Sequence, residues 1–118
     1  MNILNQIFSK NPKVLVIGDL MLDRYIFGET TRISPEAPVP IVKFFNEKFM
    51  LGGCGNVVRN LDNLGLQTSI ISALGKDATG EKIIDELRKR NISITGIVKI
   101  PTIYTTEKMR ILSNKQQI

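Results

Sequence analysis

Two short aliphatic runs, each followed by a glycine, constrain the fold of this chain most strongly. Residues 14–17 (Val-Leu-Val-Ile) stop at Gly18, and residues 69–74 stop at Gly75. The first run is continuously apolar and the second contains two small serines, and both are typical of strands that are buried on both faces, as in parallel sheets. The sequence therefore predicts at least two neighbouring parallel strands whose carboxyl ends carry glycine-containing turns.

Helical patterns fill the gaps between these runs. The first helix is expected to open at residues 52–56, to be capped by a left-handed Gly65, and to pack through an apolar stripe of Val57, Val58, Leu61 and Leu64. The second is expected to begin at the N-cap Asp77 and to end near Asn91, with core residues Ile83, Ile84 and Leu87 and a basic last turn of Arg88, Lys89 and Arg90. Strands alternating with helices predict an α/β fold with a mostly parallel sheet.

The remaining segments do not fit that alternation. Residues 25–27 form a short apolar stretch, and the prolines that precede residues 41–45 predict an edge or protruding strand. Residues 97–100 are a short strand, and residues 103–112 alternate like an exposed antiparallel strand. Residues 113–115 resemble a turn into a return strand at 116–118, so the chain is expected to be truncated inside a hairpin.

Composition excludes several classes of function. A content of 42% hydrophobic and 23% charged residues is that of a globular domain, without a membrane span or signal peptide, so a cytoplasmic location is expected. One cysteine and no histidine exclude an internal disulfide, a histidine-dependent catalytic triad and the usual zinc sites. The net charge of +5 is spread thinly, so no nucleic-acid partner is expected.

Three groups of residues could carry chemistry, and each has a structural alternative. The glycine-rich turn Gly52-Gly53-Cys54-Gly55-Asn56 could bring free backbone N–H groups to a ligand, or it could be a tight turn with Asn56 as a local cap. Asp19 and Asp23 could accept hydrogen bonds from sugar hydroxyls, or they could pair with Arg24 or Arg32 or cap a turn. Cys54 is interpreted as a small packing residue.

The third group lies on the last strand. Thr106, Lys108 and Arg110 share one face of a strand and could hold a phosphate, with Glu107 and Met109 on the opposite face. The alternative is that these charges protect an edge strand from pairing with another chain.

Taken together, these stretches resemble the ribokinase-like (PfkB-type) carbohydrate kinases. Gly18-Asp19-Leu20-Met21-Leu22-Asp23 is similar to the family's first-strand motif, and the glycine-rich turn, with Gly65 and Gly75, is similar to its N-terminal signature. Residues 32–40, 106–110 and 114–117 resemble the subgroup of D-glycero-β-D-manno-heptose 7-phosphate kinases. The family usually has alanines where this chain has Cys54, Gly55 and Val58.

The resemblance implies a ribokinase-like fold, with residues 1–118 as the N-terminal portion of the kinase domain. It implies a small β lid (about residues 24–49 plus about 103–112) that makes a homodimer contact. It also implies transfer of the ATP γ-phosphate, with Mg²⁺, to the anomeric hydroxyl of the heptose 7-phosphate in ADP-heptose and lipopolysaccharide precursor synthesis. Asp23, Gly52, Gly53 and Asn56 would hold sugar hydroxyls, and Lys108 and Arg110 would face the substrate phosphate.

The same resemblance places the catalytic base and the ATP and Mg²⁺ sites in a C-terminal half that is absent, so no catalytic residue is expected in this segment. The chain alone is then expected to be inactive. Two alternatives stay open: a kinase of another sugar in the same family, or a non-catalytic fragment that dimerises through its lid or binds a sugar phosphate. Whether a nucleotidyltransferase domain follows in the parent protein is also left open.

Overall fold

The computed structural model describes residues 2–113 and 116–117, and the chain divides into two compact units. The core unit comprises Met1–Leu22 and Leu51–Thr106, and the strand unit comprises Asp23–Met50 and Glu107–Ile118. Each unit has its own sheet, and the two are described separately below.

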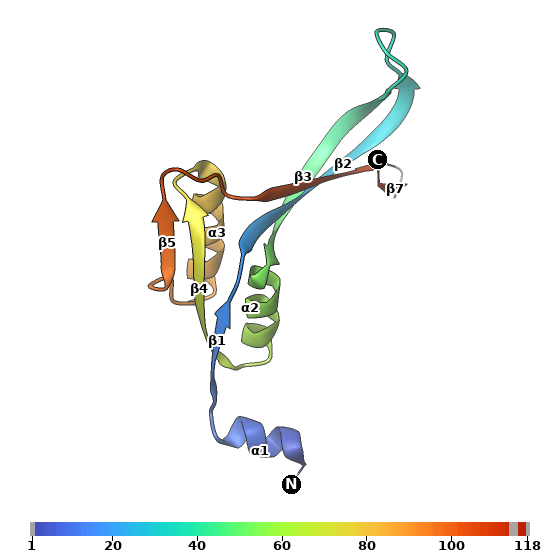
Figure 1. Ribbon diagram of the computed structural model, residues 1–118. Helices are drawn as coiled ribbons and strands as arrows, with labels where there is room; N and C mark the ends of the chain where they lie inside the picture. Colours follow the sequence, from blue (N-terminus) through green and yellow to red (C-terminus); the bar gives the residue numbers. More distant parts are fainter. Residues whose placement is uncertain (1, 114–115, 118) are drawn as a thin grey trace. The chain divides into compact units, whose positions relative to one another are not determined.

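The core unit contains a three-stranded parallel sheet in the order β1-β4-β5 (Figure 1). Strand β1 (Lys13–Ile17) pairs with β4 (Gln67–Gly75), and β4 pairs with β5 (Ile97–Ile100). The strands end where the sequence predicted, so Gly18 and Gly75 both follow or close the carboxyl ends of adjacent strands. The α/β prediction with a parallel sheet is confirmed.

Helices α2 (Cys54–Asn63) and α3 (Ala78–Lys89) pack against one face of this sheet. On that face β4 buries alternate side chains, which are Thr68, Ile70, Ser72 and Leu74. The prediction that both faces of the first strands are buried is wrong, because Leu15, Ile17 and Ile71 on the opposite face are 54%, 71% and 44% exposed. No described helix packs on that face, whereas a continuous apolar run would suit cover on both sides.

The predicted helix ends are confirmed by their hydrogen bonds. At the end of α2, Gly65 has φ +83°, its N–H donates to the Asp62 carbonyl at 2.9 Å, and the next N–H donates to the Leu61 carbonyl at 3.1 Å. The end of α3 repeats this arrangement with Asn91 at φ +58° in place of glycine. Both are Schellman motifs, in which a left-handed residue allows the last carbonyls to be bonded.

The helix interiors follow the sequence less closely. In α3 the predicted core residues Ile83, Ile84 and Leu87 are all buried. In α2 only Val58 of the predicted stripe is fully buried, while Val57 is 48% and Leu64 is 61% exposed. The short helix α1 (Ile3–Ser9), which the sequence reading missed, buries no residue. No described helix is long and apolar enough to cross a membrane.

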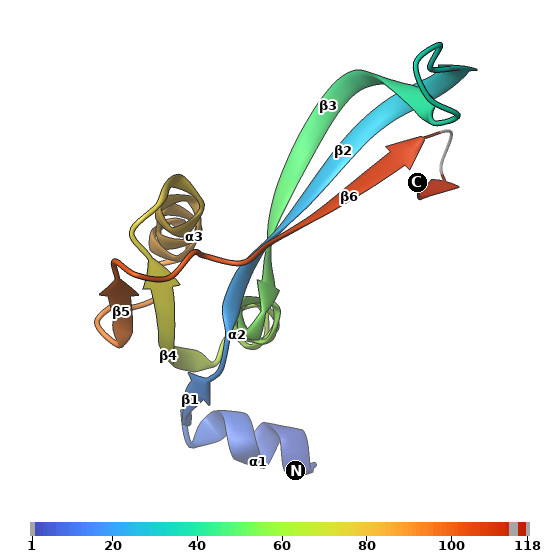
Figure 2. The same ribbon diagram turned by 45° about the horizontal axis from the view of Figure 1, so that its top comes forward.

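The strand unit is built on a twisted four-stranded sheet in the order β3-β2-β6-β7 (Figure 2). Its strands are β2 (Leu20–Ile33), β3 (Pro40–Gly53), β6 (Glu107–Ser113) and β7 (Gln116–Gln117), of which β2 begins and β3 ends within the core unit. The predicted edge strand after the prolines is confirmed, because β3 lies at one edge of the sheet and Pro40 is its first residue.

Two boundaries differ from the prediction. The apolar stretch at residues 25–27 is the middle of a 14-residue strand rather than a separate element. The last long strand begins at Glu107, and residues 103–106 belong to the core unit as an irregular segment, so Thr106 does not share a strand face with Lys108 and Arg110. Residues 114 and 115 of the predicted turn lie outside the described residues.

Candidate functional site

The glycine-rich turn lies in the core unit at the start of α2. Gly53 has φ +58°, and a Cβ atom on it would overlap the carbonyl oxygen of Asp19. The N–H of Cys54 donates to this same carbonyl at 2.9 Å. The positive φ and the close approach of the backbone both require glycine at position 53, whether or not a ligand binds there.

The first and last residues of that turn differ in exposure. Gly52 is buried, whereas Asn56 is exposed in the first turn of α2. The Asn56 side-chain oxygen accepts a hydrogen bond from Nη2 of Arg59 at 2.6 Å, and α2 has no side-chain cap. The alternative interpretation of Asn56 as a local helix cap is therefore wrong, and Asn56 presents a polar group at the surface.

Cys54 acts as a packing residue at the same helix start. Burial is the main cause that raises the pKa of its thiol, and a hydrogen bond with Ser72 only partly offsets it. A Cβ atom on Gly18 would come within 3.0 Å of the Cys54 Cβ. A thiol with a raised pKa is a poor nucleophile, which agrees with the interpretation from sequence.

One face of the strand unit brings together Asp23 and Tyr25 of β2 with Arg110 of β6. Nη1 of Arg110 lies 3.6 Å from Oδ1 of Asp23 and 3.4 Å from the Tyr25 hydroxyl, and its Cζ lies 5.6 Å from the Tyr25 ring centroid. Oδ1 of Asp23 is buried and has no hydrogen-bond partner among the described residues. The alternative in which Asp23 pairs with Arg24 or Arg32 is wrong, because its ion-pair partner is Arg110.

Lys108 shares this face with Arg110 because strand side chains alternate with period two. Its side chain is exposed and forms no ion pair with any described residue. The sequence reading missed Tyr25, since nothing in the local pattern distinguishes it from the apolar residues beside it.

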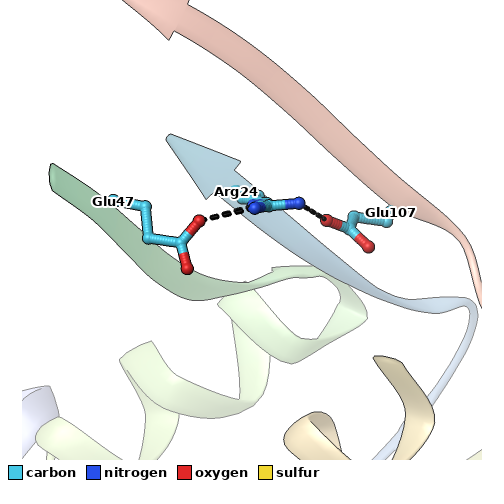
Figure 3. Close-up of polar contacts among 3 residues, drawn as sticks. All are labelled: Arg24, Glu47 and Glu107. Atoms are coloured by element: carbon cyan, nitrogen blue, oxygen red, sulfur yellow. Dashed lines mark hydrogen bonds and ion pairs between the residues drawn. The ribbon is translucent and has the colours of Figure 1, made fainter. Parts of the chain in front are cut away.

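The opposite face of the strand unit holds Arg24 between two carboxylates (Figure 3). Nε and Nη2 of Arg24 donate to Oε2 of Glu47 on β3 at 2.9 and 2.6 Å, and Nη1 lies 3.5 Å from Oε1 of Glu107 on β6. The hydrogen bond to Glu47 is the main cause that raises the pKa of Arg24. Its guanidinium also lies 5.7 Å from the ring centroid of Phe49. Arg24 therefore links three strands of the sheet.

The carboxylate of Asp77 is fully bonded in the core unit. Its Oδ1 accepts from the Gly80 N–H and its Oδ2 from the Thr105 N–H, both at 2.8 Å. These hydrogen bonds, that from Thr105 first, lower the pKa of Asp77. Asp77 thus caps α3, as the sequence predicted, and also anchors the segment that precedes β6.

A metal ion would need a cluster of ligands. Within residues 2–113 and 116–117, no group of three or more His, Cys, Asp or Glu side chains is placed to hold one. The described part of the chain thus offers no ready-made cluster of protein ligands for Mg²⁺.

Comparison with known proteins decides the family. Residues 11–118 match the family described as pfkB family carbohydrate kinase. The chain belongs to this family. It is 48% identical over 110 residues to the bifunctional protein HldE of Campylobacter concisus, a match that covers 93% of this chain and 23% of the relative. HldE of Magnetococcus marinus is 48% identical over 105 residues, with 89% and 22% covered. This pfkB family chain thus spans about a quarter of the length of these relatives.

Solved structures agree on the fold. A carbohydrate kinase from Agrobacterium tumefaciens has a TM-score of 0.70 at 29% identity, and the match covers 90% of this chain and 33% of that one. A ribokinase-like protein from the same organism has a TM-score of 0.69 at 19% identity, with 90% and 34% covered. The ribokinase-like fold expected from the resemblance is confirmed.

Proposed function

We propose that this chain is the N-terminal, sugar-binding portion of a kinase that transfers the γ-phosphate of ATP to the anomeric hydroxyl of D-glycero-D-manno-heptose 7-phosphate. The observation that carries the proposal is the 48% identity to HldE over 93% of the chain, within a carbohydrate kinase family. The product would feed ADP-heptose and lipopolysaccharide precursor synthesis in the cytoplasm. The ATP and Mg²⁺ sites and the catalytic base are assigned to residues beyond this segment.

Two sets of residues are proposed to hold the sugar phosphate. In the core unit, Gly52, Gly53 and Asn56 would bind sugar hydroxyls, and in the strand unit Asp23 would do so. The unpartnered Asp23 Oδ1 supports this role, since buried carboxylate oxygens in folded proteins normally accept hydrogen bonds. Lys108 and Arg110 would bind the phosphate, which suits an unpaired exposed ammonium and a guanidinium that has no short hydrogen bond to a carboxylate.

The strand unit is further proposed to serve as a β lid through which two copies of the kinase associate. Large exposed apolar side chains on β2, on the edge strand β3 and in the loop between them support this proposal, namely Ile33, Val39, Phe44 and Phe45 at 51–60% exposure. Light scattering of the complete polypeptide should give a dimer, and Phe44→Glu with Phe45→Glu should give a monomer. A wild-type monomer at micromolar concentration would contradict the lid-dimer proposal.

The test of the kinase function measures ADP release with the complete polypeptide that contains this chain. Heptose 7-phosphate should support turnover at least tenfold better, in kcat/KM, than fructose 6-phosphate or ribose. The 118-residue chain alone should show no turnover, because a base and preorganised anion-binding groups supply several orders of magnitude in rate. A preference for another sugar would favour the alternative kinase of the same family.

A further inference from the structure

The loosely held pair of Asp23 and Arg110 carries an inference that rests on the proposed function. Both residues belong to the strand unit, and Tyr25 lies between them in sequence and beside Arg110 in space. The separation of 3.6 Å between Arg110 Nη1 and Asp23 Oδ1 exceeds the 2.7–3.2 Å of an ordinary N–H···O hydrogen bond. The pair is thus held by charge, without the hydrogen bond that would satisfy the carboxylate.

This arrangement is unusual for a structural ion pair. Structural arginine–carboxylate pairs make short charge-assisted hydrogen bonds, near about 2.7–2.9 Å. Arg24 and Glu47 on the opposite face make two short bonds, at 2.9 and 2.6 Å. Asp23 instead has a buried oxygen that accepts no hydrogen bond from a described residue, and its side chain as a whole is 21% exposed. Arg110 keeps a side chain that is 35% exposed, and the Tyr25 ring lies against its guanidinium.

We propose that Arg110 pairs with Asp23 only when no substrate is bound, and that the sugar phosphate breaks this pair by binding to both residues. A sugar hydroxyl donates to Asp23 Oδ1 and replaces the cation, while the phosphate accepts from the guanidinium and replaces the carboxylate. Tyr25 acts as a positioning residue, because its ring holds the guanidinium on this face with either partner. No covalent bond forms or breaks in the exchange.

The exchange makes recognition of the two parts of the substrate interdependent. A ligand that carries both the sugar hydroxyl and the phosphate breaks the ion pair and gives Asp23 and Arg110 each a new partner. An unphosphorylated sugar takes Asp23 but leaves Arg110 without its anion, and inorganic phosphate does the reverse. The site therefore disfavours ligands that carry only one group, beyond the loss of the missing contact itself.

Replacing Arg110 should then improve binding of the unphosphorylated sugar, and replacing Asp23 should improve binding of inorganic phosphate. In Arg110→Gln, unphosphorylated heptose should bind about two- to fivefold more tightly, which is the range for a partly exposed ion pair, while heptose 7-phosphate binds ten- to a hundredfold more weakly. In Asp23→Asn, inorganic phosphate should bind about two- to fivefold more tightly. A simple phosphate-binding arginine predicts no gain for the unphosphorylated sugar.

Calorimetric titration of the complete polypeptide tests this inference with three probes: heptose, heptose 7-phosphate and inorganic phosphate. Glu29→Gln is the matched control for Asp23→Asn, because it removes an equal charge from an exposed position of β2. Lys43→Gln is the control for Arg110→Gln, because it removes an equal charge from an exposed position of β3 outside the proposed site. The expected result is tighter binding of heptose by Arg110→Gln and of inorganic phosphate by Asp23→Asn, with no such gain in either control variant.

Unchanged or weaker heptose binding by Arg110→Gln would overturn the inference, as would an equal gain in phosphate affinity for Glu29→Gln and Asp23→Asn. The phosphate measurement with Asp23→Asn needs neither turnover nor the sugar, and this near-isosteric variant also covers the case in which Arg110→Gln fails to fold. Failure of the kinase assay with a positive phosphate result would thus reject the proposed function while leaving the pair exchange standing.

Discussion

The two faces of the strand unit each carry an arginine that faces a carboxylate, and they use it differently. Arg24 makes two hydrogen bonds to Glu47 and one long one to Glu107, and it lies against Phe49, so each of its three guanidinium nitrogens has a carboxylate partner within the protein. Arg110 has one distant carboxylate and one weak contact with the Tyr25 hydroxyl. The first arrangement fixes three strands together, whereas the second leaves charge available to a ligand.

The acidic partners show the same contrast. Both oxygens of Asp77 accept backbone hydrogen bonds at 2.8 Å, while Oδ1 of Asp23 is buried without one. Unsatisfied buried polar groups are uncommon and occur where a ligand or water completes the bonding. Saturated charges thus identify structural residues in this molecule, and unsaturated charges identify the candidates for binding.

The largest expected effect is on Asp23. In the complete kinase, Asp23→Ala should leave two sugar hydroxyls unpaired and cost about 2–4 kcal/mol of transition-state binding, a loss of roughly 30- to 900-fold in kcat/KM. Asp19→Ala is the matched control and should cost less, since the Asp19 contacts described above use its backbone carbonyl. Equal kinetics for wild type and Asp23→Ala would remove the basis for treating the unsaturated carboxylate as a binding residue.

The next effect concerns Arg110. Arg110→Ala should raise the KM for heptose 7-phosphate about ten- to a hundredfold, because a charge-assisted contact contributes about 1.5–3 kcal/mol. Met109→Ala, on the opposite face of β6 and 50% exposed, should leave KM within twofold. An unchanged KM accompanied by loss of solubility would favour the alternative role of protecting a strand edge.

Asp77 gives a smaller effect with a defined pH dependence. Because hydrogen bonds lower its pKa in the folded state, its stabilisation is present above the ordinary pKa of about 4 and is lost as pH falls through the lower folded value. Asp77→Asn can accept only one of the two backbone hydrogen bonds, so it should destabilise the protein by about 1 kcal/mol at pH 7. The difference in stability from the wild type should narrow toward pH 2 in thermal melts. Asp85→Asn, at an exposed position of α3, should show no such gap.

The sequence predicted the core unit well where local chemistry decides the structure. Gly65 and Asn91 end their helices, and Asp77 begins one, because caps depend on residues within one turn. Burial was predicted less well. The apolar residues Leu15, Ile17 and Leu64 are exposed, since which face a neighbour covers is set by tertiary packing and not by periodicity.

The candidate site was predicted only in part for a similar reason. The shared face of Lys108 and Arg110 follows from strand alternation, and Asp23 follows from the family motif. The contact of Arg110 with Tyr25 joins residues that are 85 positions apart, and Glu107 pairs with Arg24 across 83 positions. Neither pairing could be predicted without the order of strands in the sheet, so Tyr25 was missed and Glu107 was assigned no role.

The most direct test of the contrast between the two arginines makes the same conservative change at each. Lysine keeps the charge but loses the planar fork that bonds two acceptors at once. Arg24→Lys should lower the free energy of unfolding by about 0.5–1 kcal/mol and leave the KM for heptose 7-phosphate within twofold. Arg110→Lys should raise that KM severalfold and leave the free energy of unfolding within about 0.3 kcal/mol. The reverse pattern, with KM following Arg24 and stability following Arg110, would contradict the account.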